Sequence, residues 1–285
     1  MVIAYPEILG LRSEPAIRAW TEKDAILYAL GLGFGSDGAA AGELAHVYER
    51  ELLVVPSFAV VLQRGLGVTA EALGLDYRGL VHGEQSVVLH GPLPVAGAVR
   101  GSGRVAAVYD KGPKGAIVVL DTDLEDPETG RPVASCRTTL FARRDGDCGA
   151  PREGAPPAAL PPDRQPDQSQ ILRVPQNQAL IYRLSGDLNP LHVDPQVASA
   201  AGFDRPILHG LSTFGMALRA LRLAFGDIDL GAVRGLAARF SAPVFPGEEI
   251  SFDFWRDDRT ISFQARVAAR DVLVLKSGRV ELAAA

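Results

Sequence analysis

The chain has 285 residues, 47% of them hydrophobic, with a formal net charge of −5 at pH 7. This length allows one large core or two ordinary ones, since domains usually contain about 100–150 residues. The acidic balance argues against a nucleic-acid-binding protein, and no stretch approaches the roughly 18 apolar residues of a membrane span. We therefore expect neither a nucleic-acid partner nor a membrane partner.

The first half, residues 1–144, contains short apolar runs, of which Ala25–Leu30 comes first. The later runs are typical of strands. They lie near Gly83–Leu89, Ala98–Tyr109, Gly115–Asp123 and Ser135–Arg143.

Residues 145–170 break this pattern, because they contain no apolar periodicity and are rich in proline. We expect an exposed linker here, joining two units of similar length. The six prolines are Pro151, Pro156, Pro157, Pro161, Pro162 and Pro166.

The second half, residues 171–285, has clearer periodicity. An apolar stripe between Phe214 and Phe225 predicts a long amphipathic helix, with Arg219 and Arg222 on its polar side. After it, apolar residues alternate with polar ones in 250–254 and 261–267, and a further run covers Val272–Leu282. A period of two indicates antiparallel strands with one solvated face, so we expect a sheet wrapped round a helix.

The two halves resemble each other. Ala25–Leu30 is similar to Ala179–Leu184, which lies 154 residues later. Pro92–Gly97 is similar to Pro243–Gly247, at an offset near 150 residues, and both follow a strand-like run. Two matches in the same order predict a duplicated fold rather than a chance similarity.

The densest polar cluster on an apolar background is Tyr182–His192. Gly186 is suited to end a helix, and Pro190 then forces a turn that carries Asp187, Asn189 and His192. A carboxylate and an imidazole that hold one water are what hydration chemistry needs. Each residue taken alone could instead be an ordinary turn residue or a structural histidine.

The sequence Leu208-His209-Gly210 stands just before the long helix. Glycine lets a ligand approach its backbone N–H closely, and the N-terminus of a helix favours negative charge. The N–H of Gly210 would therefore suit an oxyanion. His209 could act only through a hydrogen bond to the backbone.

The stretch Gln178–Gly215 resembles the signature of the MaoC-like, type 2 enoyl-CoA hydratases. Both Tyr-x-Leu-Ser-Gly-Asp-x-Asn-Pro-Leu-His and its continuation, Ala201–Gly210, are complete. In the first half, Trp20–Gly33, 81–85 and Asp110–Gly112 are similar to the N-terminal half of the eukaryotic hydratase 2 enzymes.

The resemblance implies an α+β protein with two tandem hot dog folds, a pseudo-dimer in one chain. Residues 1–144 would form a degenerate domain for the acyl group and CoA, 145–170 the linker, and 171–285 the catalytic domain. The first half lacks Asp-x-Asn-Pro-x-His, so one active site is expected. The family's activity is reversible syn addition of water to trans-2-enoyl-CoA, giving an (R)-3-hydroxyacyl product.

By the same resemblance, Asp187, His192 and Asn189 are catalytic and Gly210 binds the thioester oxygen. Which of Asp187 and His192 is the base stays open. The resemblance implies substrate binding by His82, Gly83, Lys111, Leu188, Pro190, Leu191 and Phe240. Lys111 could equally be a solvated turn lysine, and Phe240 a core residue.

No cofactor and no metal ion are expected, since no histidine–carboxylate group has ligand spacing. The alternatives are a dehydratase of a carrier-bound, steroid side-chain or polyketide thioester, and a non-catalytic acyl-binding subunit. Cys136 and Cys148 match no metal site or disulfide framework, so two free thiols are expected. With neither a secretory signal nor a terminal Ser-Lys-Leu, we expect a cytoplasmic bacterial enzyme that could form a homodimer.

Overall fold

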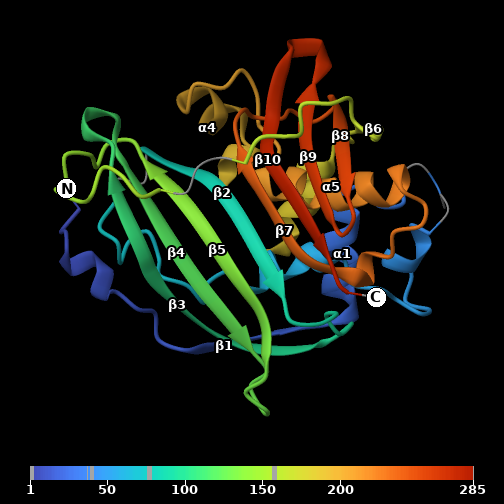
Figure 1. The fold of residues 1–285 in the computed structure, drawn as a ribbon, viewed down its shortest axis with the longest axis horizontal. Coiled ribbons are helices and arrows are strands. Elements are labelled where there is room, and N and C mark those ends of the chain that lie inside the picture. The colour runs from blue at the N-terminus through green and yellow to red at the C-terminus, as the bar shows by residue number, and fades with distance from the viewer. Residues whose placement is uncertain (1–2, 37, 39–41, 76–78, 156–158, 285) are drawn as a thin grey trace.

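The structure is a computed structural model, and it describes residues 3–36, 38, 42–75, 79–155 and 159–284. Its strands form a single ten-stranded sheet in the order β1-β3-β4-β5-β2-β7-β10-β9-β8-β6, with every neighbouring pair antiparallel. In Figure 1 the strands of the first half and those of the second meet where β2 lies beside β7. No helix in these described ranges is long and apolar enough to cross a membrane.

Within its described residues, the first half contributes two α-helices and five strands. They are β1 (Ala16–Trp20), α1 (Glu22–Gly31), α2 (Ala59–Leu62), β2 (Leu80–Leu89), β3 (Gly97–Asp110), β4 (Ala116–Glu125) and β5 (Pro132–Ala142). The described part of the second half contributes three α-helices and five strands. They are β6 (Gln168–Arg173), α3 (Gln178–Tyr182), α4 (Pro195–Ala200), α5 (Gly210–Ala224), β7 (Val233–Phe240), β8 (Glu249–Asp257), β9 (Thr260–Val267) and β10 (Val272–Leu282).

The strand order confirms the duplication. Reading from each outer edge inward, the first half runs β1-β3-β4-β5-β2 and the second runs β6-β8-β9-β10-β7, so each strand has a counterpart. The predicted alternation of residues 250–254 and 261–267 lies in β8 and β9, and the run Val272–Leu282 is β10. The predicted hot dog architecture is confirmed.

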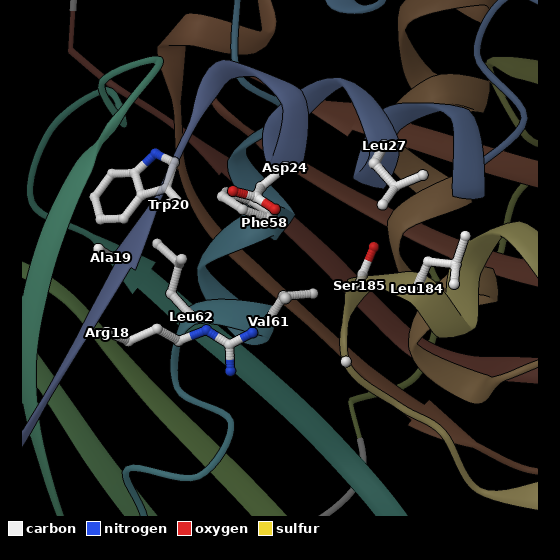
Figure 2. Close-up of a pocket in the computed structure, with 11 residues that line it drawn as sticks. Arg18, Ala19, Trp20, Asp24, Leu27, Phe58, Val61, Leu62, Leu184 and Ser185 are labelled. Carbon is white, nitrogen blue, oxygen red and sulfur yellow. The ribbon is translucent and has the colours of Figure 1, made fainter.

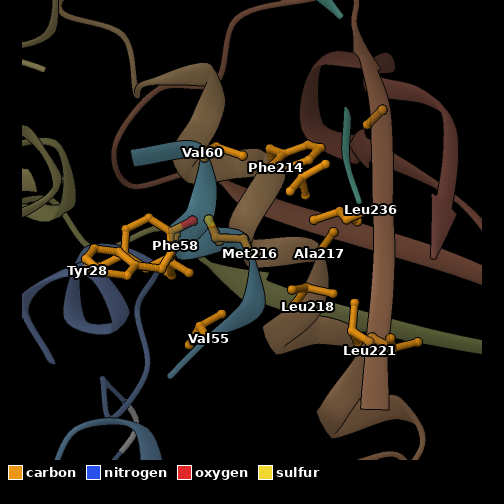
Figure 3. Close-up of a cluster of buried hydrophobic side chains, with 14 of the residues drawn as sticks. Tyr28, Val55, Phe58, Val60, Phe214, Met216, Ala217, Leu218, Leu221 and Leu236 are labelled. Atoms are coloured by element: carbon orange, nitrogen blue, oxygen red, sulfur yellow. The ribbon is translucent and has the colours of Figure 1, made fainter. Parts of the chain in front are cut away.

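The long helix of the second half is also confirmed as α5, whose residues Ser212 to Leu221 are all buried. Figure 3 shows the reason: Tyr28 and Phe58 of the first half lie against Met216, while Leu236 of β7 lies near Ala217. Helix α5 is therefore covered by the sheet on one side and by the first half on the other.

The corresponding helix of the first half is much shorter than expected. A 3-10 turn at Pro56–Phe58 leads into α2, which ends at Leu62. Gly65 follows with a φ of +79°, a left-handed conformation that stops helices and that glycine adopts at little cost. Only one of the two hot dog folds therefore has a long central helix.

Arg219, on the predicted polar side of α5, is buried and not solvated. Arg219 is 1% exposed, and its Nε donates to Oε1 of Glu43, also 1% exposed, at 2.5 Å. The helical stripe places this side chain opposite the second-half sheet, but the first half occupies that space. Glu43 then supplies the charge that a buried guanidinium requires.

The start of the proline-rich segment is packed, not exposed as predicted. Cys148 and Ala150 are buried against the first-half sheet. The carboxylate of Asp110 accepts the backbone N–H groups of Asp147, at 3.0 Å, and Gly149, at 3.4 Å. At the other end of the segment, strand β6 already begins at Gln168. Both cysteines are buried and free, as expected.

Candidate active site

The predicted catalytic turn begins where α3 runs into a 3-10 turn at Arg183–Ser185. Gly186 ends this turn with a φ of +117°, so the chain reverses before Asp187. Oδ1 of Asn189 accepts the N–H of Leu191 at 3.0 Å and caps the next 3-10 turn, Pro190–His192. Asn189 therefore shapes the turn that separates the Asp187 carboxylate from the His192 imidazole.

Three side chains of this region converge. One ligand-type atom from each of Asp187, His192 and His209 lies within 4.8 Å of the other two. Nδ1 of His192 lies 2.9 Å from the carbonyl oxygen of Ile207, and Nε2 of His209 lies 3.0 Å from that of Asp187. A carbonyl only accepts, so these nitrogens carry the protons, and Nε2 of neutral His192 has a free lone pair.

Both imidazoles are held neutral. Burial lowers the pKa of His192 below its usual value. Burial, together with the neighbouring His192, lowers the pKa of His209 to about 4. The rings stack with centroids 3.6 Å apart, so a charge on one opposes a charge on the other. The carboxylate of Asp187 and Nε2 of His192 can therefore both accept a proton at this site.

Gly210 is the first residue of α5, directly after His209. The first N–H groups of a helix have no partner inside the helix, so this one is available to a ligand. A Cβ at position 210 would lie 3.3 Å from Cδ1 and Cε1 of Phe240, so the aromatic ring of β7 lies against the glycine. Phe240 also contacts His82 edge to face, with centroids 4.9 Å apart.

His82 enters this group from the first half. The register of β2 against β5 shifts between His82 and Glu84, so Gly83 occupies a β-bulge, a feature that redirects side chains. Nε2 of His82 donates to the carbonyl oxygen of Glu84 at 3.2 Å, and burial lowers the pKa of His82 to about 4. The structure therefore links His82 to Gly210 through the Phe240 ring, and substrate contact by His82, Gly83 and Phe240 stays a prediction.

Arg64, a residue of the first half that no sequence motif singles out, also reaches this site. Its guanidinium donates to Oδ1 of Asp187 at 2.9 Å. No local signal points to it, because Arg64 stands in an undistinguished turn 123 residues before its partner. Its contact with Asp187 requires the two halves to pack together.

Although their sequence spacing matches no metal site, Asp187, His192 and His209 lie close enough together in space to hold a metal ion. Their donor atoms fit poorly. The Nε2 proton of His209 is committed to a carbonyl, and the two rings are stacked instead of converging on one point. The Arg64 guanidinium already pairs with Asp187 and would repel a second cation.

A small pocket, partly open to solvent, lies beside the catalytic turn (Figure 2). Gly186, the residue before Asp187, is part of its wall, as are Leu184 and Ser185. The remaining wall belongs to the first half and is mostly apolar. It consists of Arg18, Ala19, Trp20, Asp24, Leu27, Phe58, Val61 and Leu62.

Of the other predicted substrate-binding residues, three lie on the catalytic turn, whereas Lys111 lies in the turn between β3 and β4. Leu188 is 58% exposed, Pro190 is exposed and Leu191 is half-buried, all on the catalytic turn. Nζ of Lys111 donates to the carbonyl oxygen of Arg152 at 3.1 Å and lies 6.0 Å from the Tyr109 ring. Substrate contact by these residues stays a prediction.

Comparison with known proteins agrees with this geometry. Residues 19–144 match the MFE-2 hydratase 2 N-terminal domain, and residues 157–277 match the MaoC like domain. The 3-hydroxyacyl-thioester dehydratase Y of Mycobacterium tuberculosis is 42% identical over 288 residues, covering 98% of each chain. Enoyl-CoA hydratase ChsH3 of the same organism is 37% identical over 287 residues, covering 99% of each.

Among solved structures, the MaoC-like dehydratase from Phytophthora capsici superposes with a TM-score of 0.85, at 31% identity and over 98% of each chain. A Mycobacterium tuberculosis protein with a double hot dog fold superposes with a TM-score of 0.57 at 15% identity, over 95% of this chain and 96% of that one, which supports the fold alone. The chain therefore belongs to the MaoC-like hydratase 2 family, with a hydratase 2 N-terminal domain followed by a MaoC-like domain.

Proposed function

We propose that this protein is an (R)-specific 2-enoyl-CoA hydratase, a hydro-lyase that also runs in reverse as a (3R)-hydroxyacyl-CoA dehydratase. The observation that carries the proposal is the convergence of Asp187 and His192 beside the N-terminus of α5, where the N–H of Gly210 is free of intrahelical partners. This arrangement combines two proton acceptors with an oxyanion donor.

In the proposed reaction, one water is held between the Asp187 carboxylate and Nε2 of His192. The pair takes a proton from the water while its oxygen bonds to carbon 3 of the enoyl thioester. The electrons of the double bond move to the thioester oxygen, which the N–H of Gly210 stabilises. The proton held by the pair then passes to carbon 2, so the atoms of one water are consumed.

Asp187 and His192 act as one unit in this scheme, because a proton shared between close groups belongs to the pair. Both lie on the same turn, and so they reach the substrate from one side. Delivery of oxygen and proton from one face gives syn addition, and the family resemblance gives the (R) configuration.

We place the acyl group in the cavity beside Gly186. Its mainly apolar wall, including Trp20, Phe58 and Leu62, suits a hydrocarbon chain. CoA would extend toward the end of the sheet that carries Lys111. The backbone N–H of Lys111 donates to the carbonyl oxygen of Gly115, and Gly115 lies against the end of β5. That end of β5 pairs with the start of β2, the strand that carries His82. The basic side chain of Lys111 would there meet the CoA phosphates.

The alternative substrate is a thioester other than a simple fatty acyl-CoA, such as a carrier-bound, steroid side-chain or polyketide thioester. The relative named 3-hydroxyacyl-thioester dehydratase Y keeps this open, because its name specifies the thioester and not the carrier. Activities on crotonyl-CoA and decenoyl-CoA, compared with those on the carrier-bound forms, separate the two. A non-catalytic acyl-binding subunit is disfavoured, because Asp187 and His192 are both present and have side-chain atoms within 4.8 Å of each other.

The variants Asp187→Asn and His192→Gln test the reaction. Each should fold and lose about two to four powers of ten in hydration rate, the usual contribution of a general acid or base. Asp194→Asn is the matched control, since Asp194 only caps α4 through the N–H of Gln196 at 2.8 Å, and asparagine caps equally well. Chiral analysis of the product should give the (R) alcohol. Near-normal turnover in either catalytic variant would refute the proposal.

We also propose a cytoplasmic location, a role in fatty acid β-oxidation and assembly as a homodimer. The dimer is supported by three exposed leucines on α3 and the turn that follows it: Leu180, Leu184 and Leu188 are 55%, 57% and 58% exposed. Exposed apolar side chains gathered in one region are typical of a contact surface. Sedimentation at several concentrations measures the assembly state.

A further inference from the structure

We propose that Arg64, which belongs to the half without its own catalytic motif, is a positioning residue for the catalytic carboxylate of the other half. Its guanidinium would fix one oxygen of Asp187 so that the other oxygen meets the water. This inference rests on the proposed hydratase function.

The two oxygens of Asp187 have different surroundings. Oδ1 accepts from the Arg64 guanidinium at 2.9 Å and from the N–H of Asn189 at 3.4 Å. A carboxylate with one oxygen tied by two donors has a restricted rotation, so Oδ2 is aimed and ready to accept a proton. Asn189 holds that oxygen from within the turn, whereas Arg64 holds it from the opposite half of the molecule.

The Arg64 backbone is anchored on both sides. Its N–H donates to the carbonyl oxygen of Val61 at 3.1 Å, and its carbonyl accepts from a guanidinium nitrogen of Arg18 at 2.9 Å. The side chain then passes the catalytic turn, since a Cβ at Gly186 would lie 3.6 Å from Cδ of Arg64 and 3.4 Å from a guanidinium nitrogen of Arg18. Gly186 therefore leaves the space through which Arg64 reaches Asp187.

The short helix α2 explains why Arg64 can make this contact. Pro56, which starts the first-half helical segment, precedes Gly210 by 154 residues, and at the same offset Arg64 corresponds to Leu218, a fully buried residue in the middle of α5. Because α2 ends at Leu62, residue 64 lies in a turn instead of a buried helix. The short first-half helix thus leaves residue 64 in a turn whose side chain reaches Asp187 of the other half.

A purely stabilising ion pair is the competing explanation. The Arg64 and Asp187 side chains are 44% and 24% exposed, and ion pairs with such exposure contribute little stability, about 0–1 kcal/mol. The same exposure leaves the guanidinium accessible to small solutes. A positioning role and a stabilising role therefore differ in what they predict for turnover, melting temperature and chemical rescue.

Arg64 also influences the histidines of the site. The charged and titratable groups that act on His192 are Asp187 on its own turn, His209 stacked on it, and Arg64 from the first half. Of these, Arg64 opposes protonation of His192 and thereby lowers its pKa, in addition to the larger effect of burial. Its removal should raise the pKa of His192. The acid limb of the pH profile, where activity is lost as the imidazole is protonated, should then move to higher pH.

The test compares Arg64→Ala and Arg64→Lys with the control Arg256→Ala, which breaks an exposed ion pair of the same 2.9 Å length between Arg256 and Asp227. We expect Arg64→Ala to lose about ten- to a hundredfold in kcat, the usual effect of a misplaced catalytic group, with an unchanged melting temperature. Added guanidinium chloride at millimolar concentration should restore part of this rate, and sodium chloride of equal ionic strength should not. Arg64→Lys should keep the position of the acid limb of the pH profile, because it keeps the charge, and recover part of kcat.

Wild-type kcat and an unshifted acid limb in Arg64→Ala would overturn the inference. So would a loss of rate that follows a lower melting temperature and that neither guanidinium nor lysine restores, since that result assigns Arg64 to the fold. If Asp187→Asn is inactive while Arg64→Ala is normal, only this inference fails. If Asp187→Asn itself is active, the proposed function fails.

Discussion

The imidazole of His209 lies nearly parallel to that of His192, with 26° between the ring planes and 3.6 Å between the centroids. His209 is 1% exposed, and its Nδ1 has no hydrogen-bond partner within the described part of the chain. The stack therefore keeps one imidazole buried and neutral behind the other, which faces Asp187. This arrangement has consequences for how the protein responds to acid.

We expect the protein to lose stability as the pH falls from about 6.5 toward 4. The unfolded chain protonates its histidines near pH 6.5, whereas burial and His192 lower the pKa of His209 in the folded state to about 4. The unfolded state then binds more protons, so each pH unit costs up to about 1.4 kcal/mol for such a histidine. His209→Phe should flatten the fall of the melting temperature between pH 7 and 5, while His90→Gln, at an exposed position, should leave it unchanged. An identical slope in His209→Phe contradicts the prediction.

Replacing Gly210 by proline should remove the oxyanion donor without breaking α5. Proline is well tolerated at the first position of a helix, and His209 already has the extended conformation, φ −58° and ψ 132°, that a residue before proline requires. Losing one such donor costs about two to three powers of ten in kcat. The control is Gly210→Ala, which meets the same Phe240 ring at 3.3 Å but keeps its N–H. Equal hydration rates in the two variants would show that this N–H does not bind the thioester oxygen.

The buried ion pair between Arg219 and Glu43 should be essential for joining the two halves. Arg219→Met leaves the Glu43 carboxylate, 1% exposed, without its cation, and such a loss costs about 3–5 kcal/mol. The double variant Arg219→Met with Glu43→Gln should lose less than the sum of the single losses, because neither charge remains. Urea denaturation measures all three free energies of unfolding. A single-variant loss below about 1 kcal/mol would argue against a tightly coupled pair.

Leu27→Trp should restrict the enzyme to shorter acyl chains. Leu27 is half-buried on α1 and lines the cavity beside Gly186, where Figure 2 shows its side chain directed toward Ser185. A larger side chain there should lower kcat/KM for decenoyl-CoA by about tenfold or more while leaving crotonyl-CoA nearly unchanged, since one methylene in an apolar pocket is worth about 1–3 kcal/mol.

The matched control for this change is Leu30→Trp, on the same helix but 39% exposed and outside the cavity wall. The wild-type enzyme should prefer long or bulky acyl groups over four-carbon ones. A strict preference for crotonyl-CoA, or an equal loss on both substrates in Leu27→Trp, would mean that the acyl chain lies elsewhere.

Much of the fold could be predicted from the sequence because its signals are local. The stripe from Phe214 to Phe225 and the alternation in β8, β9 and β10 each depend on residues within one element, and the structure contains all four. The catalytic turn is equally local: Gly186, Pro190 and the cap at Asn189 bring Asp187 and His192 together over six residues.

The sequence by itself determined the duplicated sheet, the helix α5 and the turn that pairs a carboxylate with an imidazole. Only the tertiary structure decided that Arg219 is buried on Glu43, that α2 is short and that Arg64 reaches Asp187. The physical reason is the packing of one half against the other. Periodicity reports which face of an element is apolar, but it does not report which distant charge that face will meet.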